Sequence, residues 1–157
     1  MIRFVENQEE KRRIAETILT DLPDWFGIPE SVQTYISESA DMPFWAAFEA
    51  EIPLGFISMK QTSPHTAEIY VMGVRKCSHR SGIGRGLHRA LEDYAKQQGY
   101  SYLQVKTVQM GHYDQYDCTN RFYVAMGFRE LECFPTLWDE GNPCMVYVKY
   151  IGEGDLT

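Results

Sequence analysis

The chain has 157 residues, of which 44% are hydrophobic and 24% charged, and its formal net charge is −7. This length fits a single domain, and this composition is that of an ordinary globular protein, so neither intrinsic disorder nor a second domain is expected. The negative charge argues against a nucleic-acid partner, which would need a basic patch for the phosphates.

Metal, membrane and secretory functions are also disfavoured. The four cysteines are widely spaced, and neither they nor the four histidines follow a zinc-binding spacing, so no metal is expected. No apolar run approaches the roughly 18 residues that a membrane span needs. The first residues lack the pattern of a signal peptide, and the expected location is therefore the cytoplasm.

The first half of the chain is expected to hold two helices and four strands. Ile14, Ile18 and Leu19 form one apolar stripe, which predicts an amphipathic helix. Turn residues separate the later strands, which favours an antiparallel meander, and the last strand is apolar on both faces and so should be central. The predicted elements are a strand at residues 2 to 5, helices at 8 to 20 and 29 to 38, and strands at 44 to 48, 54 to 60 and 67 to 74.

The second half is expected to contain the longest helix, because Leu87 and Leu91 recur at helical spacing before Gly99, a typical C-terminal cap. The last two strands are expected to be joined by a long, turn-rich connector at residues 134 to 144. The predicted elements are helices at 82 to 98 and 113 to 126, and strands at 100 to 108, 128 to 133 and 145 to 151.

A glycine-rich turn at residues 79 to 87 lies between the central strand and the long helix. Glycines let a backbone approach a ligand, and the free amides at a helix N-terminus attract anions, so the turn predicts a phosphate or pyrophosphate site. Leu87 stands where the dinucleotide fingerprint needs its third glycine, and the Gly-Lys-Ser/Thr ending of a P-loop is missing. A turn that serves only helix–strand packing is the alternative.

The run from Val74 to Leu87 resembles the acyl-CoA-binding motif of the GNAT superfamily of N-acetyltransferases, Gln/Arg-x-x-Gly-x-Gly/Ala at the start of a long helix. Gly82 and Gly84 match this motif, and His79 occupies the Gln/Arg position. The segment FYVAMGF at residues 122 to 128 is similar to the family's Phe-Tyr-x-x-x-Gly-Phe segment. The order of elements also agrees. The resemblance implies one α+β domain over residues 1 to 157, with a mixed, mostly antiparallel central sheet flanked by helices.

The resemblance further implies acetyl-CoA as the cofactor, with its pyrophosphate on the turn and its pantetheine arm along the strand at residues 67 to 74. A bulge at Gly73 would aim an amide at the thioester oxygen, and an ordinary buried glycine is an equal alternative. The implied cofactor-binding residues are Met72, Gly73, Val74, His79, Arg80, Ser81, Gly82, Ile83, Gly84, Arg85 and Gly86.

Two catalytic roles follow from the same resemblance. Tyr123 would protonate the departing thiolate, with a core aromatic as the alternative, and Glu68 would act as a base through water, with a solvent-facing strand end as the alternative. Other candidate bases are His112, Asp114 and Asp139. Cys144 is not expected to be a nucleophile, because no visible motif places an activating histidine beside it.

The expected acceptor pocket combines aromatic and acidic residues of the connectors, which suit an ammonium-bearing substrate. Small clusters of side chains under loops are the alternative. The residues expected to bind the acceptor are Trp25, Phe26, Tyr113, Trp138 and Asp139, with Tyr116 nearby and residues 134 to 144 as a lid.

The leading hypothesis is an enzyme that transfers an acetyl group from acetyl-CoA to a primary amine of a small molecule, by direct attack in a ternary complex. One alternative is a catalytically weak acyl-CoA-binding regulatory module on the same fold. Another is a protein or peptide N-acetyltransferase. The resemblance is also compatible with a homodimer, because dimers are common in the family.

Overall fold

The computed structural model describes residues 1–152 and contains four α-helices and seven strands in that range. None of these helices is long and apolar enough to cross a membrane. In chain order the elements are β1 (Ile2–Phe4), α1 (Gln8–Thr20), α2 (Pro29–Ser39), β2 (Phe44–Glu49), β3 (Ile52–Gln61), β4 (Thr66–Val74), the 3-10 turn η1 (Lys76–Ser78), α3 (Ile83–Gln97), β5 (Tyr102–Val108), α4 (Asp114–Ala125), β6 (Arg129–Asp139) and β7 (Asn142–Tyr150).

All seven strands form one sheet in the order β1-β2-β3-β4-β5-β7-β6, and every neighbouring pair is antiparallel except β4 and β5. The α+β class, the antiparallel meander and the central position of β4 are therefore confirmed. The parallel pair needs a crossover, which α3 supplies.

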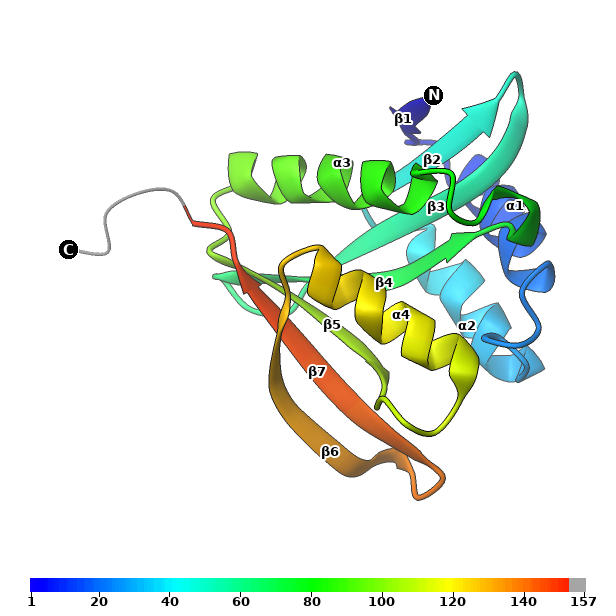
Figure 1. Ribbon diagram of the computed structural model, residues 1–157. Coiled ribbons are helices and arrows are strands. Elements are labelled where there is room, and N and C mark those ends of the chain that lie inside the picture. Colours follow the sequence, from blue (N-terminus) through cyan, green and yellow to red (C-terminus); the bar gives the residue numbers. More distant parts are fainter. Residues whose placement is uncertain (153–157) are drawn as a thin grey trace.

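Two helices cover each face of the sheet: α1 and α2 lie on one face, and α3 and α4 on the other (Figure 1). Leu87 and Leu91 of α3 are fully buried in the core between the sheet and α3 and α4. Ile18 and Leu19 of α1 are fully buried in the core on the other side, between the sheet and α1 and α2. The stripes that predicted these helices are thus the surfaces that they pack against the sheet.

The bulge in β4 lies at Tyr70 and not at Gly73, so the second of the two alternatives for Gly73, an ordinary buried glycine, holds. Ser58 of β3 pairs with Val71 and Met59 pairs with Ile69, so Tyr70 is the extra residue, whereas Gly73 pairs regularly with Phe56. Gly73 is needed for space, because a Cβ there would lie 2.9 Å from Cγ2 of Ile18 on α1. Glycine at this position therefore lets β4 and the helix α1 pack closely together.

The predicted connector at residues 134 to 144 is also wrong. β6 continues to Asp139 and β7 begins at Asn142, so this segment is the end of a hairpin with a two-residue turn. Pro135 is tolerated in β6 because β6 is an edge strand, where a missing N–H costs no ladder bond on the outer side. Four residues, 135 to 138, bulge out between the pairs at Phe134 and Asp139.

Candidate active site

The parallel pairing of β4 and β5 extends only from Thr66–Tyr102 to Ile69–Val105. Both strands continue beyond that point, β4 to Val74 and β5 to Val108, and their backbones separate there. The separated half of β4 presents N–H and C=O groups toward the opening. Such an edge can bind an extended ligand as a further strand does.

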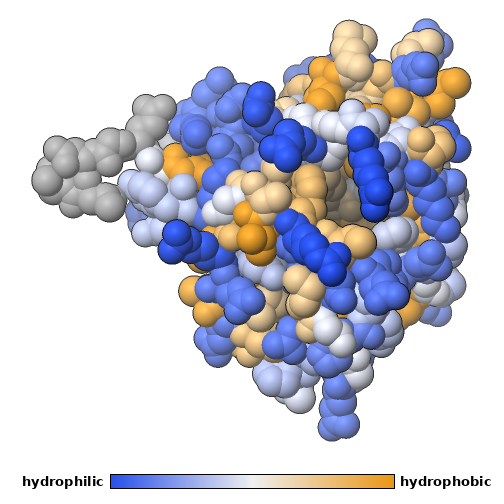
Figure 2. All heavy atoms as spheres, in the orientation of Figure 1, coloured by the Kyte–Doolittle hydropathy of each residue, from blue (hydrophilic) through white to orange (hydrophobic). Residues whose placement is uncertain are grey.

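A recess lies above this opening, between α3 and α4. Figure 2 shows it as a hollow with a hydrophobic floor, rimmed by hydrophilic side chains. A Cβ on Gly84 of α3 would lie 3.2 Å from Met72 Cε of β4 and 3.3 Å from a ring carbon of Phe122 of α4. Elements α3, α4 and β4 therefore meet at the floor of the recess. The recess stays open at Gly84 because glycine has no Cβ to fill it.

The glycine-rich turn forms the start of α3 at the rim of this recess. Gly82 is the N-cap and has a φ of +86°, and no side chain caps the first amides of the helix. These amides and the helix dipole create a positive potential that suits an anion. Arg80 also adopts the left-handed region, with φ of +64°, and both Arg80 and Arg85 are exposed.

His79 is tied to the protein itself. Its Nε2 lies 2.7 Å from the carbonyl oxygen of Val74, a hydrogen bond that requires the proton on Nε2. The ring meets the indole of Trp25 edge-on at 5.6 Å. The side chain of His79 thus connects the end of β4 with the α1–α2 loop, while the neighbouring backbone remains at the rim.

Tyr123 of α4 is buried, with 6% of its surface exposed, and lies on the face of the sheet that carries α3 and α4. Its ring packs against Phe122, Phe128 and Tyr147. Burial raises the pKa of the phenol above its usual range, so the group stays protonated. The structure therefore places a phenol at a core position and keeps it protonated, as the acid role requires.

Glu68 of β4 lies on the opposite face of the sheet, because Ala67 and Ile69 on either side of it belong to the layer under α3 and α4. It is not a solvent-facing residue, since only 6% of it is exposed. Gln104 donates a hydrogen bond of 2.8 Å to its carboxylate, and the Lys106 ammonium lies 3.2 Å away. The two predicted catalytic residues are thus separated by the sheet, close to the point where it opens.

The α1–α2 loop is docked on the first half of α4. The indole of Trp25 donates to the Gln115 carbonyl at 3.2 Å, and the Tyr116 hydroxyl donates to the Trp25 carbonyl at 2.7 Å. Burial, followed by the charges of Tyr35 and Tyr113, raises the pKa of Tyr116 to about 12. The predicted acceptor residues Trp25 and Tyr113 are thereby brought to one region.

Trp138 and Asp139 are not brought to that region. They lie at the end of the β6–β7 hairpin, whose turn is at the bottom of the view in Figure 1, apart from the α1–α2 loop. The Asp139 carboxylate accepts hydrogen bonds from the Gly141 amide and the Asn142 side chain, both at 2.9 Å, and so closes its own turn.

Sequence reasoning missed a cluster on the α1–α2 side of the opening. Tyr70, the bulge residue, donates a hydrogen bond to the Glu38 carboxylate of α2. Tyr35 meets Tyr70 at 5.5 Å between ring centroids, and Phe26 meets Tyr35 at 5.9 Å. The spacing of Tyr35 and Glu38 places them on one helix face, which was the available signal.

Asn120 of α4 was also missed. It is fully buried, donates to the carbonyls of Val108 and Tyr116, and accepts from the Tyr147 hydroxyl at 2.6 Å. It thereby anchors α4 to both β5 and β7 below the recess.

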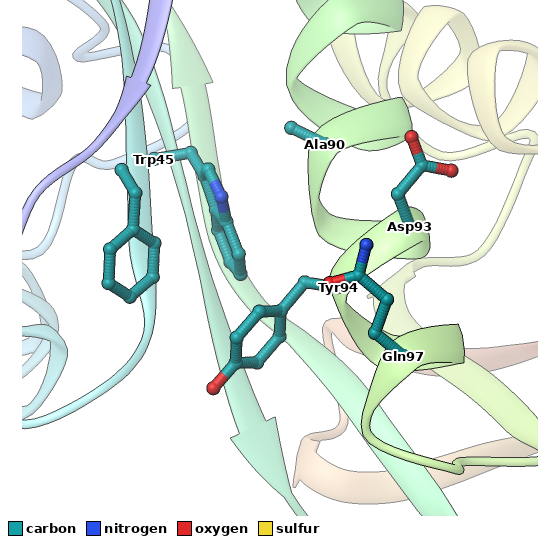
Figure 3. Close-up of a pocket in the computed structure, with 6 residues that line it drawn as sticks. Trp45, Ala90, Asp93, Tyr94 and Gln97 are labelled. Carbon is teal, nitrogen blue, oxygen red and sulfur yellow. The ribbon is translucent and has the colours of Figure 1, made fainter.

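A separate cavity of about 270 Å³ lies on the outer side of α3, against β1 and β2, remote from the opening between β4 and β5 (Figure 3). Trp45 and Tyr94 pack edge to face in it at 5.2 Å. The rings of its wall are thus packed on one another, and the cavity belongs to the seam between β2 and α3. Its lining residues are Phe4, Trp45, Ala90, Asp93, Tyr94 and Gln97.

Comparison with known proteins agrees with this geometry. The sequence matches the Acetyltransferase (GNAT) family over residues 10–128. A comparison with curated proteins finds no match.

Three solved structures illustrate the similarity in fold. The aminoglycoside 6'-N-acetyltransferase from Enterococcus faecium is 17% identical, with a TM-score of 0.75 and 99% of each chain covered. The ribosomal-protein-S18-alanine N-acetyltransferase from Escherichia coli is 16% identical, with a TM-score of 0.78, covering 100% of this chain and 98% of that one. The protein yncA from Salmonella typhimurium, solved with its cofactor acetyl-CoA, is 15% identical, with a TM-score of 0.72 and coverage of 100% and 96%.

Proposed function

Because this chain belongs to the GNAT acetyltransferase family and uses acetyl-CoA as its acyl donor, we propose that it transfers the acetyl group to a primary amine of a small-molecule acceptor. Transfer occurs by direct attack in a ternary complex. The observation that carries this proposal is the opening between β4 and β5, with a helix N-terminus at one end of it and a carboxylate and a phenol on its two faces.

The residues of the chain fit the donor. The free amides at the start of α3, with Arg80 and Arg85 beside them, would hold the pyrophosphate. The separated edge of β4, from Met72 to Val74, would pair with the extended pantetheine arm. Bound acetyl-CoA supplies an activated thioester carbonyl, and the opening would direct it toward the far face of the sheet.

The acceptor would approach from the face that carries α1 and α2. An amine attacks only in its neutral form, so a base must remove a proton, and Glu68, which lies on this face, would do so through water. Tyr123, on the other face, would give its proton to the departing sulfur. Separate positions suit these separate roles, because in the tetrahedral intermediate the nitrogen that loses a proton and the sulfur that leaves and gains one are different substituents of the same carbon.

The acceptor wall would be formed by Trp25, Phe26 and Tyr113, which lie around the docked α1–α2 loop. Trp138 and Asp139 could reach an acceptor only if it extends toward the β6–β7 hairpin. Aromatic faces favour an organic ammonium over an uncharged acceptor.

The test is release of CoA thiol from acetyl-CoA in the presence of a panel of small amines, amino acids, amino sugars and short peptides, with product masses measured. Acetylated small amines are expected. Tyr123→Phe should lower kcat at least tenfold and leave the affinity for acetyl-CoA unchanged, since the ring is kept and only the hydroxyl group that donates the proton is removed.

Two outcomes contradict the proposal. Binding of acetyl-CoA without thiol release on any amine supports a regulatory module, and acetylation of peptides alone supports a protein N-acetyltransferase. Full turnover by Tyr123→Phe at saturating substrate would remove the acid role from this residue.

A further inference from the structure

The bulge at Tyr70 lies at the apex of the opening. Ile69, the residue before it, makes the last pair with β5, at Val105. A bulge adds one residue to a strand and so changes where the following side chains point. Tyr70 and Val71 consequently both lie in the layer under α1 and α2, on the side where the acceptor enters.

Tyr70 is aimed at α2, where its hydroxyl donates a hydrogen bond to the Glu38 carboxylate. The ring of Tyr35 stands against that of Tyr70, and the ring of Phe26 stands against Tyr35, so three aromatic rings form a continuous wall that ends at this carboxylate. Burial and the nearby carboxylate raise the pKa of Tyr70 above its usual range, which keeps its hydroxyl a donor. The carboxylate is thus held in one orientation.

Glu38 differs from Glu68 in how its charge is balanced. Lys106 and Gln104 bind Glu68, which is buried. Glu38 is exposed, and among residues 1–152 no Lys, Arg or His lies within ion-pair distance of it. Lys60 lies over the ring of Tyr70, 5.7 Å from its centroid. A carboxylate accepts up to about four hydrogen bonds, so Glu38 keeps acceptor sites beyond the one that Tyr70 occupies.

We propose that Glu38, oriented by Tyr70, binds a second, non-reacting ammonium group of the acceptor. This inference rests on the proposed function and narrows its substrate class to small molecules with at least two amino groups. The reacting amine is not the group that Glu38 binds, because a bare carboxylate would favour its protonated form and so oppose attack. The aromatic wall provides the face along which the carbon chain between the two amines lies.

The experiment compares two amines that differ by one ammonium group, 1,4-diaminobutane and 1-aminobutane, as acceptors in the thiol-release assay. For the unmodified protein, kcat/KM for the diamine is expected to exceed that of the monoamine at least tenfold, after correction for its two equivalent amines. Glu38→Gln should bring this ratio close to one by raising KM for the diamine only. Tyr70→Phe keeps the ring and removes the donor, and should lower the ratio by a smaller factor.

Glu30→Gln is the matched control, because it removes the same charge from the exposed first turn of the same helix and should leave the ratio unchanged. A ratio near one in the unmodified protein, or a ratio that Glu38→Gln does not alter, overturns this inference while acetyl transfer to amines stands. If acetyl-CoA binds and no amine of the wider panel releases thiol, the proposed function fails and this inference fails with it.

Discussion

Lowering the pH below 6.5 is expected to destabilise the protein through one histidine, His88 of α3. Only 4% of its surface is exposed, its ring packs edge-on against Phe128 at 5.5 Å, and its Nε2 is buried without a hydrogen-bond partner. Burial lowers the pKa of His88 to about 4. Lys149 on β7 and two arginines of α3 lower it as well, whereas Glu92 acts in the opposite direction.

The direction and size of this change in the free energy of unfolding follow from the linkage between proton binding and folding. In the unfolded chain the pKa of His88 is near 6.5, so between this pH and about 4 the unfolded state binds a proton that the folded state does not bind. The free energy of unfolding is therefore at its full value above pH 6.5 and falls as the pH drops from 6.5 to about 4. At about 1.4 kcal/mol per pKa unit, the loss contributed by this residue is roughly 3 kcal/mol.

The assay is urea unfolding at several pH values between 8 and 4, for the unmodified protein and for His88→Leu. Leucine is apolar and of similar size, and it also removes the unpaired nitrogen, so His88→Leu should fold and show a flatter pH dependence across this window. His65→Leu, at an exposed turn, is the control and should keep the slope of the unmodified protein. Equal slopes for the unmodified protein and His88→Leu would refute the reasoning.

Three glycine substitutions separate the reasons for which the chain uses glycine. Gly73→Ala places a Cβ 2.9 Å from buried Ile18, and overpacking is expected to lower the free energy of unfolding by about 1–3 kcal/mol, so an unchanged urea midpoint contradicts it. Gly82→Ala meets no atom within 4 Å but must hold a φ of +86°, and a loss of about 1 kcal/mol is expected in the same measurement. Gly84→Ala lies in a helix that favours alanine, yet its Cβ would reach Phe122 at the floor of the recess, so calorimetry should show weaker acetyl-CoA binding at nearly unchanged stability.

Local patterns predicted those parts of the fold that depend on local physics. The stripe of Ile18 and Leu19 gave α1, because an amphipathic period is fixed by the face that a helix buries. The helix predicted to start at residue 82 begins at Ile83, with Gly82 as its N-cap. Each of these features is determined within a few residues along the chain.

The features that were missed depend on pairing between distant segments. The bulge at Tyr70 exists only relative to β3, and its partner Glu38 lies 32 residues away, so no pattern within β4 reports either. A glycine inside a strand is compatible with a bulge or with close packing, and the sequence alone does not distinguish the two at Gly73. The side chain of Ile18 on α1, which leaves no room for a Cβ at Gly73, identifies close packing as the reason. The strand predicted at residues 128 to 133 ended too early, since the extension of β6 to Asp139 depends on its pairing with β7 and on its place at the sheet edge, where Pro135 is tolerated.

Direct attack and transfer through an acetylated cysteine make different demands on the protein, and Cys144, one of four free cysteines, does not meet the demands of the second route. It is fully buried on β7, and burial raises the pKa of its thiol to about 11, so the thiolate that would attack a thioester is scarce at neutral pH. Lys106, which lowers this pKa, is already paired with Glu68. A buried thiol of this kind disfavours the covalent route, whereas the proposed direct attack through the opening between β4 and β5 requires no cysteine.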